Sequence, residues 1–218
     1  MPAKPAARRP RQRLTPEDRE HQIVQAAIGF FAKNGFEGST KTLAAELGIA
    51  QGSLFRYFPT KEALIARVYN EMLARRWNSV WEERLADRST PLADRLKRHF
   101  KEYAQFILQS EWVRIFLQAG LSHLSLNQKY LSRLRERHFE LIAREMRHEF
   151  GIPPGKDAAA DDEEIELIWA LDASVFYMGI RKWVYELPTP KNIDRVIEMR
   201  VDVFLAGAAQ VLKAERSR

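Results

Sequence analysis

From Thr15 onward, apolar residues recur three and four positions apart, and this spacing is the feature that most restricts the fold. An α-helix brings such positions onto one face, whereas a half-buried strand requires strict alternation of apolar and polar residues. No stretch of the sequence shows that alternation between turn residues. The chain is therefore predicted to be all-α.

Capping residues, glycines and prolines divide the periodic sequence into about nine helices. Three short ones come first, and a glycine-bearing turn at Gly48 separates the second from the third, which is the composition of a helix-turn-helix unit. Pro59 prevents continuation of the third. The expected helices are 15–34, 39–47, 50–57, 61–87, 91–109, 111–124, 127–150, 161–187 and 190–214.

Length and composition agree with two unequal folded domains. The chain has 218 residues, with 45% hydrophobic and 29% charged side chains, which is ordinary globular usage and allows a packed core. We predict an arm at residues 1–16, a helix-turn-helix domain at 17–60 and a larger helical domain at 61–218.

The positive charge is concentrated near the N-terminus. Residues 1–61 hold 10 Lys and Arg against 5 Asp and Glu, whereas residues 62–218 hold 25 against 24. The first 16 residues combine prolines with basic side chains and no acid, which predicts a disordered arm whose candidate nucleic-acid contacts are Arg8, Arg9, Arg11 and Arg13. An anionic membrane surface and a merely solubilising tail are the alternatives.

Several functional classes lack their sequence signals. The chain has no cysteine, so disulfides, thiolate metal sites and cysteine catalysis are excluded. Its five histidines are spread over four expected helices without metal-binding spacing, and phosphate-binding and nucleophile motifs are missing. We therefore expect no enzyme, no cofactor and no metal. No uncharged apolar run approaches about 18 residues and no signal peptide is recognisable, so a cytoplasmic protein is expected.

One segment resembles a known family. The sequences GFEGSTKTLA at 35–44, LGIAQGSLFRYF at 47–58 and KEAL at 61–64 closely resemble the DNA-binding domain of TetR-family transcriptional regulators. The agreement in order, spacing and residue type spans residues 20–65. The resemblance implies an N-terminal helix-turn-helix DNA-binding domain followed by a variable helical domain that binds an effector and dimerises.

The start of the third helix suits a recognition helix in the major groove. Gln51 can present an amide to a base edge, Gly52 permits close approach, and the Ser53 hydroxyl can reach a base or phosphate. Ser39 and Arg56 are further candidates. The resemblance implies DNA contacts at the positions Thr40, Lys41, Gln51, Gly52, Ser53, Phe55, Tyr57 and Lys61.

Some of these positions have a plainer interpretation. The aromatic residues Phe55 and Tyr57 can be core residues, as we expect for Phe58, while Ser39 and Thr40 can serve only as helix caps. The sequence also departs from the family, because Phe55 replaces the usual Tyr and the turn before Ser39 is one residue shorter.

The larger domain carries aromatic residues that suit a pocket for an apolar or aromatic effector, although core packing explains most of them equally well. The candidate lining residues are Trp77, Trp81, His99, Tyr103, Phe106, Trp112, Phe116, His123 and Phe176. The resemblance implies that the last two helices form a four-helix dimer interface, with candidates Trp169, Asp172, Phe176, Gly179, Trp183, Val196, Arg200, Phe204 and Gly207.

These features lead to one functional hypothesis and one rival. The hypothesis is a homodimeric transcriptional regulator, a repressor that binds a near-palindromic double-stranded operator at the bacterial nucleoid and is released by an unknown small-molecule effector. No membrane association is expected. The rival is a helix-turn-helix protein that is controlled by a protein partner, or that organises DNA, without a small-molecule effector.

Overall fold

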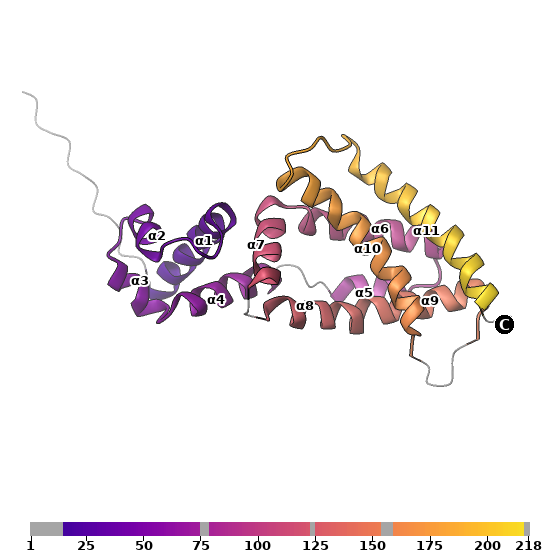
Figure 1. The fold of residues 1–218 in the computed structure, drawn as a ribbon. Helices are drawn as coiled ribbons and strands as arrows, with labels where there is room; N and C mark the ends of the chain where they lie inside the picture. The colour runs from indigo at the N-terminus through magenta and orange to yellow at the C-terminus, as the bar shows by residue number, and fades with distance from the viewer. Residues whose placement is uncertain (1–14, 75–78, 123–124, 154–158, 216–218) are drawn as a thin grey trace, which may run out of the picture.

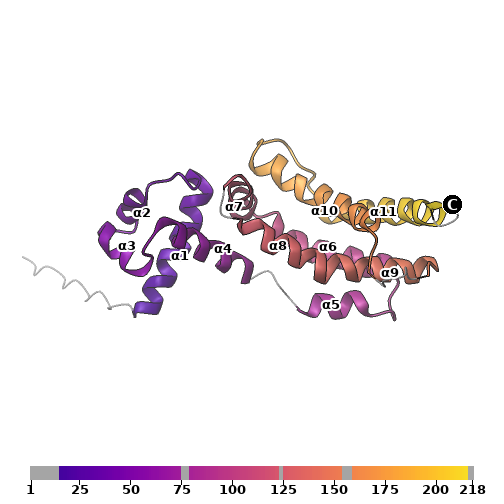
Figure 2. The same ribbon diagram turned by 60° about the horizontal axis from the view of Figure 1, so that its bottom comes forward.

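The structure is a computed structural model that describes residues 15–74, 79–122, 125–153 and 159–215. Regular secondary structure in these ranges is helical throughout, which confirms the all-α expectation. Figures 1 and 2 show a small group of helices at one end, here called the head (α1–α4), and a longer bundle, here called the body (α5–α11).

Most helix bounds lie within a few residues of those expected from the sequence. In the head they are α1 (Pro16–Asn34), α2 (Thr40–Glu46), α3 (Gln51–Tyr57) and α4 (Lys61–Ala74). In the body they are α5 (Ser79–Ala86), α6 (Leu92–Ile107), α7 (Ser110–Leu121), α8 (Leu126–Leu134), the π-helical turn η1 (Arg135–Phe139), α9 (Glu140–Phe150), α10 (Asp162–Trp183) and α11 (Ile193–Glu215).

Two expected helices differ from the structure. The helix expected at 61–87 is represented by α4 and α5, between which residues 75–78 lie outside the described ranges. The helix expected to reach 187 ends at Trp183, because the Tyr185 and Leu187 amides turn back onto the carbonyls of Ile180 and Arg181. The run at 127–150 is helical as expected, with η1 inserted between α8 and α9.

The head forms because its four helices share one apolar centre. Thr15 caps α1 by accepting a hydrogen bond from the Asp18 amide at 3.1 Å, and Pro16 occupies the first turn. The apolar stripe of α1 is buried as predicted. It meets Leu43 of α2, Leu54 of α3 and Leu64 of α4, all of which are fully buried in the same core.

The head is joined to the body by direct packing of α1 and α4 against α7 and α8. Tyr69 of α4 lies against Trp112 of α7, with ring centroids 6.0 Å apart, and its hydroxyl hydrogen-bonds Asn127 of α8 at 2.8 Å. Asn127 in turn donates to the Phe116 carbonyl at 3.0 Å. These contacts connect α4 of the head directly to α7 and α8 of the body.

The body carries two buried ion pairs besides its apolar core. Arg147 of α9 pairs with Glu164 of α10 at 2.5 Å, and Arg95 of α6 pairs with Glu145 of α9 at 3.0 Å. Each pair joins two helices. Removing one partner of such a buried pair typically destabilises a protein by about 3–5 kcal/mol, because the remaining charge is left buried without a counterion. Over the ranges that the structure describes, none of the helices combines the length and apolar character that crossing a membrane requires.

Candidate nucleic-acid interface

The helix-turn-helix of α2 and α3 is fixed by a short turn and one polar contact. Gly48 adopts φ 65°, a left-handed conformation that suits glycine, and the Ile49 amide bonds back to the Ala44 carbonyl. The Gln51 side-chain amide donates to the Thr40 hydroxyl at 3.0 Å, linking the first turns of the two helices. The recognition helix is thus held in place before any DNA is present.

The predicted DNA-contact residues differ in exposure. Thr40 is only 8% exposed, and its hydroxyl accepts the hydrogen bond from Gln51, so it organises the unit in the free protein. Ser39 caps α2 by accepting from the Lys41 amide at 3.2 Å. The exposed members of the set are Ser39, Lys41, Gly52 and Arg56, and the half-buried ones are Gln51, Ser53, Phe55, Tyr57 and Lys61.

The surface of α3 combines positive charge with aromatic edges. Lys41, Arg56 and Lys61 bring cations from α2, α3 and the start of α4, and α3 itself carries no acid. Phe55 and Tyr57 pack partly against the core and keep part of their rings exposed, whereas Phe58 is buried as expected. A cationic and aromatic surface of this kind suits phosphates and base edges.

The arm and two aromatic candidates fall outside the described ranges. These are Arg8, Arg9, Arg11, Arg13, Trp77 and His123, and their predicted roles stay predictions.

The remaining effector candidates pack into two aromatic clusters in the body. In the first, Trp81 of α5 contacts His99, Tyr103 and Phe106 of α6 at centroid distances of 5.6–6.1 Å. Burial, followed by the charge of nearby His138, holds the pKa of His99 well below its usual value. His99 is therefore neutral at physiological pH.

The second aromatic cluster connects α7, α8 and α10. Phe116 contacts Trp112 and Phe176 at 5.3 Å each, and the Tyr130 ring lies 5.4 Å from Trp112. Trp112 and Tyr130 are buried, whereas Phe116 and Phe176 are half-buried at the outer edge. This cluster touches α4 through Tyr69.

Some candidates for the dimer interface face the interior of their own chain. Asp172 is 8% exposed, and a Cβ on Gly179 would lie 2.7 Å from the Val113 side chain of α7. Asp172 and Gly179 were expected on the surface stripe of the dimer interface. Both instead lie on the inward face of α10. The half-buried Trp169 and Trp183 contact Phe139 and the Leu108 carbonyl of the same chain.

The outward faces of α10 and α11 carry apolar side chains that the sequence interpretation missed. Val196, Arg200 and Phe204 are half-buried and Gly207 is exposed, as an accessible stripe requires. Between and beside them lie the exposed Tyr177, Met199, Val203 and Val211, of which Val203 is 73% exposed. On α11, Met199, Val203 and Val211 follow one another at intervals of four and eight residues, which the sequence shows, but it does not show which stripe faces outward.

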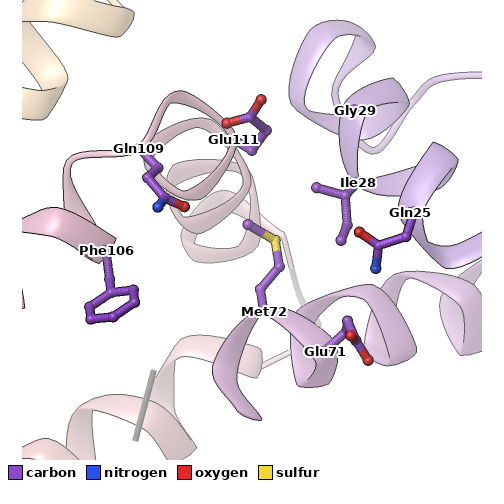
Figure 3. A pocket seen from close by; sticks show the side chains of 8 residues that line it. All are labelled: Gln25, Ile28, Gly29, Glu71, Met72, Phe106, Gln109 and Glu111. Carbon is purple, nitrogen blue, oxygen red and sulfur yellow. The ribbon is translucent and has the colours of Figure 1, made fainter. Parts of the chain in front are cut away.

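A cavity of about 420 Å³ lies between the head and the body (Figure 3). Its walls come from α1 and α4 on one side and from α6 and α7, with Gln109 between them, on the other. The lining residues are Gln25, Ile28, Gly29, Glu71, Met72, Phe106, Gln109 and Glu111. The side-chain packing between head and body is thus incomplete at this junction, which leaves room for relative movement.

The fold and the site define a class of protein with a helix-turn-helix head on a helical body, and comparisons with known proteins show what the chain is similar to. Residues 23–68 match the model described as "Bacterial regulatory proteins, tetR family". The Vibrio harveyi "HTH-type transcriptional regulator LuxR" is 35% identical over 68 residues, 31% of this chain and 33% of that protein. The Bacillus subtilis (strain 168) "Uncharacterized HTH-type transcriptional regulator YuxN" is 34% identical over 55 residues, 25% of this chain and 19% of that protein.

The matches thus span about a third of the first curated relative and about a fifth of the second.

Solved structures match over most of the chain. A TetR-like regulator from Rhodococcus sp. RHA1 aligns with a TM-score of 0.65 and 20% identity, covering 89% of this chain and 100% of that one. The fatty acid degradation regulator FadR from Bacillus halodurans aligns with 0.63 and 14%, covering 89% and 97%. Residues 23–68 are thus similar to the DNA-binding domain of the TetR family and the whole chain shares the fold of TetR-like structures, which confirms the resemblance found in the sequence.

Proposed function

We propose that this protein is a homodimeric transcriptional repressor that binds a near-palindromic operator and is released from it by a small apolar or aromatic effector. The observation that carries the proposal is the preformed α2–α3 unit, whose exposed side is cationic and polar while its inner side is locked into the head core. We place the protein in the bacterial cytoplasm, at the nucleoid.

The DNA-binding role is supported by two kinds of side chain on the head, one suited to phosphates and the other to base edges. Lys41, Arg56 and Lys61 supply charge for phosphate contacts, which set affinity and salt dependence. Gln51 and Ser53, at the start of α3, supply hydrogen-bonding groups for base edges. In the complex, the Gln51 amide exchanges its hydrogen bond to Thr40 for one to a base, or keeps it and presents its oxygen.

The homodimer is supported by the apolar stripe on α10 and α11. Exposed Tyr177, Met199, Val203 and Val211 form a concentration of apolar surface that water disfavours and that a second copy would cover. A twofold dimer places two identical heads on DNA, and inverted half-sites follow from that symmetry. Their centres lie about one helical turn, or a multiple of it, apart.

Release by an effector is supported by the connection between the second aromatic cluster and α4. An occupant that displaces Trp112 or Phe116 acts on Tyr69 and Asn127, and through them on α4 and α8. The cavity between head and body leaves α4 space to respond. Release requires that the effector bind the two head positions unequally, since equal affinity shifts no equilibrium.

The direct test is selection from a random duplex pool, followed by affinity measurements at several salt concentrations. We expect an inverted repeat. Lys41→Ala should weaken binding to all sequences and reduce the salt slope by about one unit, while Gln51→Ala should relax the preference at one position of each half-site, at a cost of about 1–3 kcal/mol. Lys33→Ala is the matched control, because Lys33 lines a hollow facing Ser110 and Arg114 of the body.

Two outcomes would contradict the proposal. If binding is weak, independent of sequence and unchanged by Lys41→Ala and Gln51→Ala, the head does not recognise an operator. If an inverted repeat is selected but no small molecule releases it, the rival function stands, in which a protein partner controls the protein or the protein organises DNA.

A further inference from the structure

The middle of α10 carries an acidic side chain where a core residue is expected. Asp172 is 8% exposed and lies against Tyr103 of α6, whose hydroxyl hydrogen-bonds the carboxyl group. The other oxygen, Oδ1, has no hydrogen-bond partner within the described ranges. No ion pair in the described part of the chain involves Asp172, so its charge is uncompensated.

A chain of aromatic contacts leads from this carboxyl group into the second aromatic cluster. The Tyr103 hydroxyl lies 2.8 Å from the Tyr130 hydroxyl, and Tyr130 packs on Trp112. Phe176 follows Asp172 by four residues on α10, which places both on one helix face, and its ring contacts Phe116. Asp172 is therefore connected to the second aromatic cluster through Tyr103 and Tyr130, and Phe176 of the same cluster lies one turn further along α10.

This arrangement is costly for the free protein. Burial raises the pKa of Asp172 to about 7, and the hydrogen bond from Tyr103 offsets only part of that effect. Among the described residues, no cation acts on this pKa: the titratable side chains connected to the carboxyl group are Tyr103, Tyr130 and, stacked on Tyr103, the neutral His99. A neutral side chain at this position would cost less to bury. The presence of an acid therefore suggests a ligand whose positive charge compensates the carboxylate.

We propose that Asp172, Tyr103, Tyr130, Trp112, Phe116 and Phe176 form a binding site for a small organic cation, an amine attached to an aromatic or apolar body. The ammonium group donates to Asp172 Oδ1, and the ring faces add cation–π attraction and apolar contact. The ligand enters by displacing the rings of Phe116 and Phe176, which form the exposed edge of the cluster. This inference rests on the proposed function, because it names the chemical class of the effector.

The first test compares two probes of equal shape by calorimetry at pH 7.5. 1-Naphthylmethylamine carries a positive charge, and 1-naphthalenemethanol is its neutral counterpart. The native protein should bind the amine at least about tenfold more tightly than the alcohol, a difference of about 1.4 kcal/mol. Asp172→Asn should abolish this preference and leave the alcohol's affinity within about threefold, while Glu166→Gln, which removes an exposed acid from the same helix, should preserve it.

The second test measures protons at pH 6, where Asp172 in the free protein is mostly protonated. Binding of the amine should release close to one proton per chain, detected by repeating the titration in buffers of different ionisation enthalpy. Binding of the alcohol should release none, and the Asp172→Asn variant should release none with either probe. A structural role for Asp172 alone would not produce this proton release.

Equal affinity for the two probes, or failure of the amine to bind at millimolar concentration, would overturn the proposal. So would an amine affinity that survives Asp172→Asn. These results are separable from failure of the proposed function, because operator selection uses the free protein. If the protein selects an inverted repeat but shows no preference for the amine, only the cation-site proposal is refuted and the proposed DNA-binding function stands.

Discussion

The buried carboxyl group of Asp172 makes a quantitative prediction about stability. The pKa of this group is about 7 in the folded chain and 3.8 in the reference state, with burial as the main cause. At any pH between these two pKa values, the carboxyl group is therefore protonated in the folded state and ionised in the unfolded state. At 1.36 kcal/mol per unit, the group costs the folded state roughly 4 kcal/mol once pH exceeds about 7.

The sign follows from the proton count. Below about pH 4 both states are protonated and the cost is absent, so stability from this group is greatest there and is lost as pH rises to about 7. Asp172→Asn keeps the shape and is neutral at every pH. Relative to the native protein, the variant should gain roughly 3 kcal/mol in free energy of unfolding between pH 5 and pH 8.

The assay is urea unfolding at fixed protein concentration, at pH 5, 6, 7 and 8, followed by tryptophan fluorescence and circular dichroism. The slope of the difference with pH is the decisive quantity, because an unpaired amide in the variant adds a constant cost of about 1–3 kcal/mol. Burial lowers the pKa values of His99 and His138, but both titrate in each protein and cancel in the difference. A difference that is flat with pH, or that falls as pH rises, would refute a buried, uncompensated carboxyl group.

Two further predictions concern packing and assembly. Gly179→Ala should lower the free energy of unfolding by about 1–3 kcal/mol, because the new Cβ would lie 2.7 Å from Val113, whereas Gly29→Ala, with nothing within 4 Å, should raise it by about 0.5–1 kcal/mol. Equal denaturation midpoints for the two variants would contradict the α7–α10 contact. Val203→Glu should convert the dimer to monomer in light scattering, because this 73% exposed side chain belongs to the α10–α11 stripe. Leu121→Glu, at an 84% exposed position on α7, is the control and should leave the mass unchanged; a monomeric native protein would remove the basis of the dimer proposal.

Local signals predicted the head well. The apolar stripe of α1, Gly48 at the turn and Pro59 after α3 are all short-range features, and the structure has these elements where the sequence predicted them. The recognition residues sit at the start of a short helix, so their placement depended only on finding that helix. The bond between Gln51 and Thr40 spans eleven positions and was not foreseen, because it depends on how α2 and α3 cross.

In the body, the sequence showed which residues are apolar but not which side of a helix each would face. Helices α10 and α11 carry more apolar residues than one face needs, so periodicity allowed Asp172 and Gly179 to be assigned to the outer stripe. The structure turns both inward, against Tyr103 and Val113, and leaves Tyr177 and Val203 outside.

The sequence by itself determined the helical class and the helix-turn-helix head, since each rests on contacts between residues close in the chain, and it supplied the candidate residues for DNA contact. Only the tertiary structure decided that Asp172 is buried without a counterion in the described ranges, that the aromatic residues form two clusters, and that a cavity lies beside the contact between head and body. These properties arise where helices distant in sequence meet. Their rotation and spacing are set by the packing of the whole body, which no local pattern specifies.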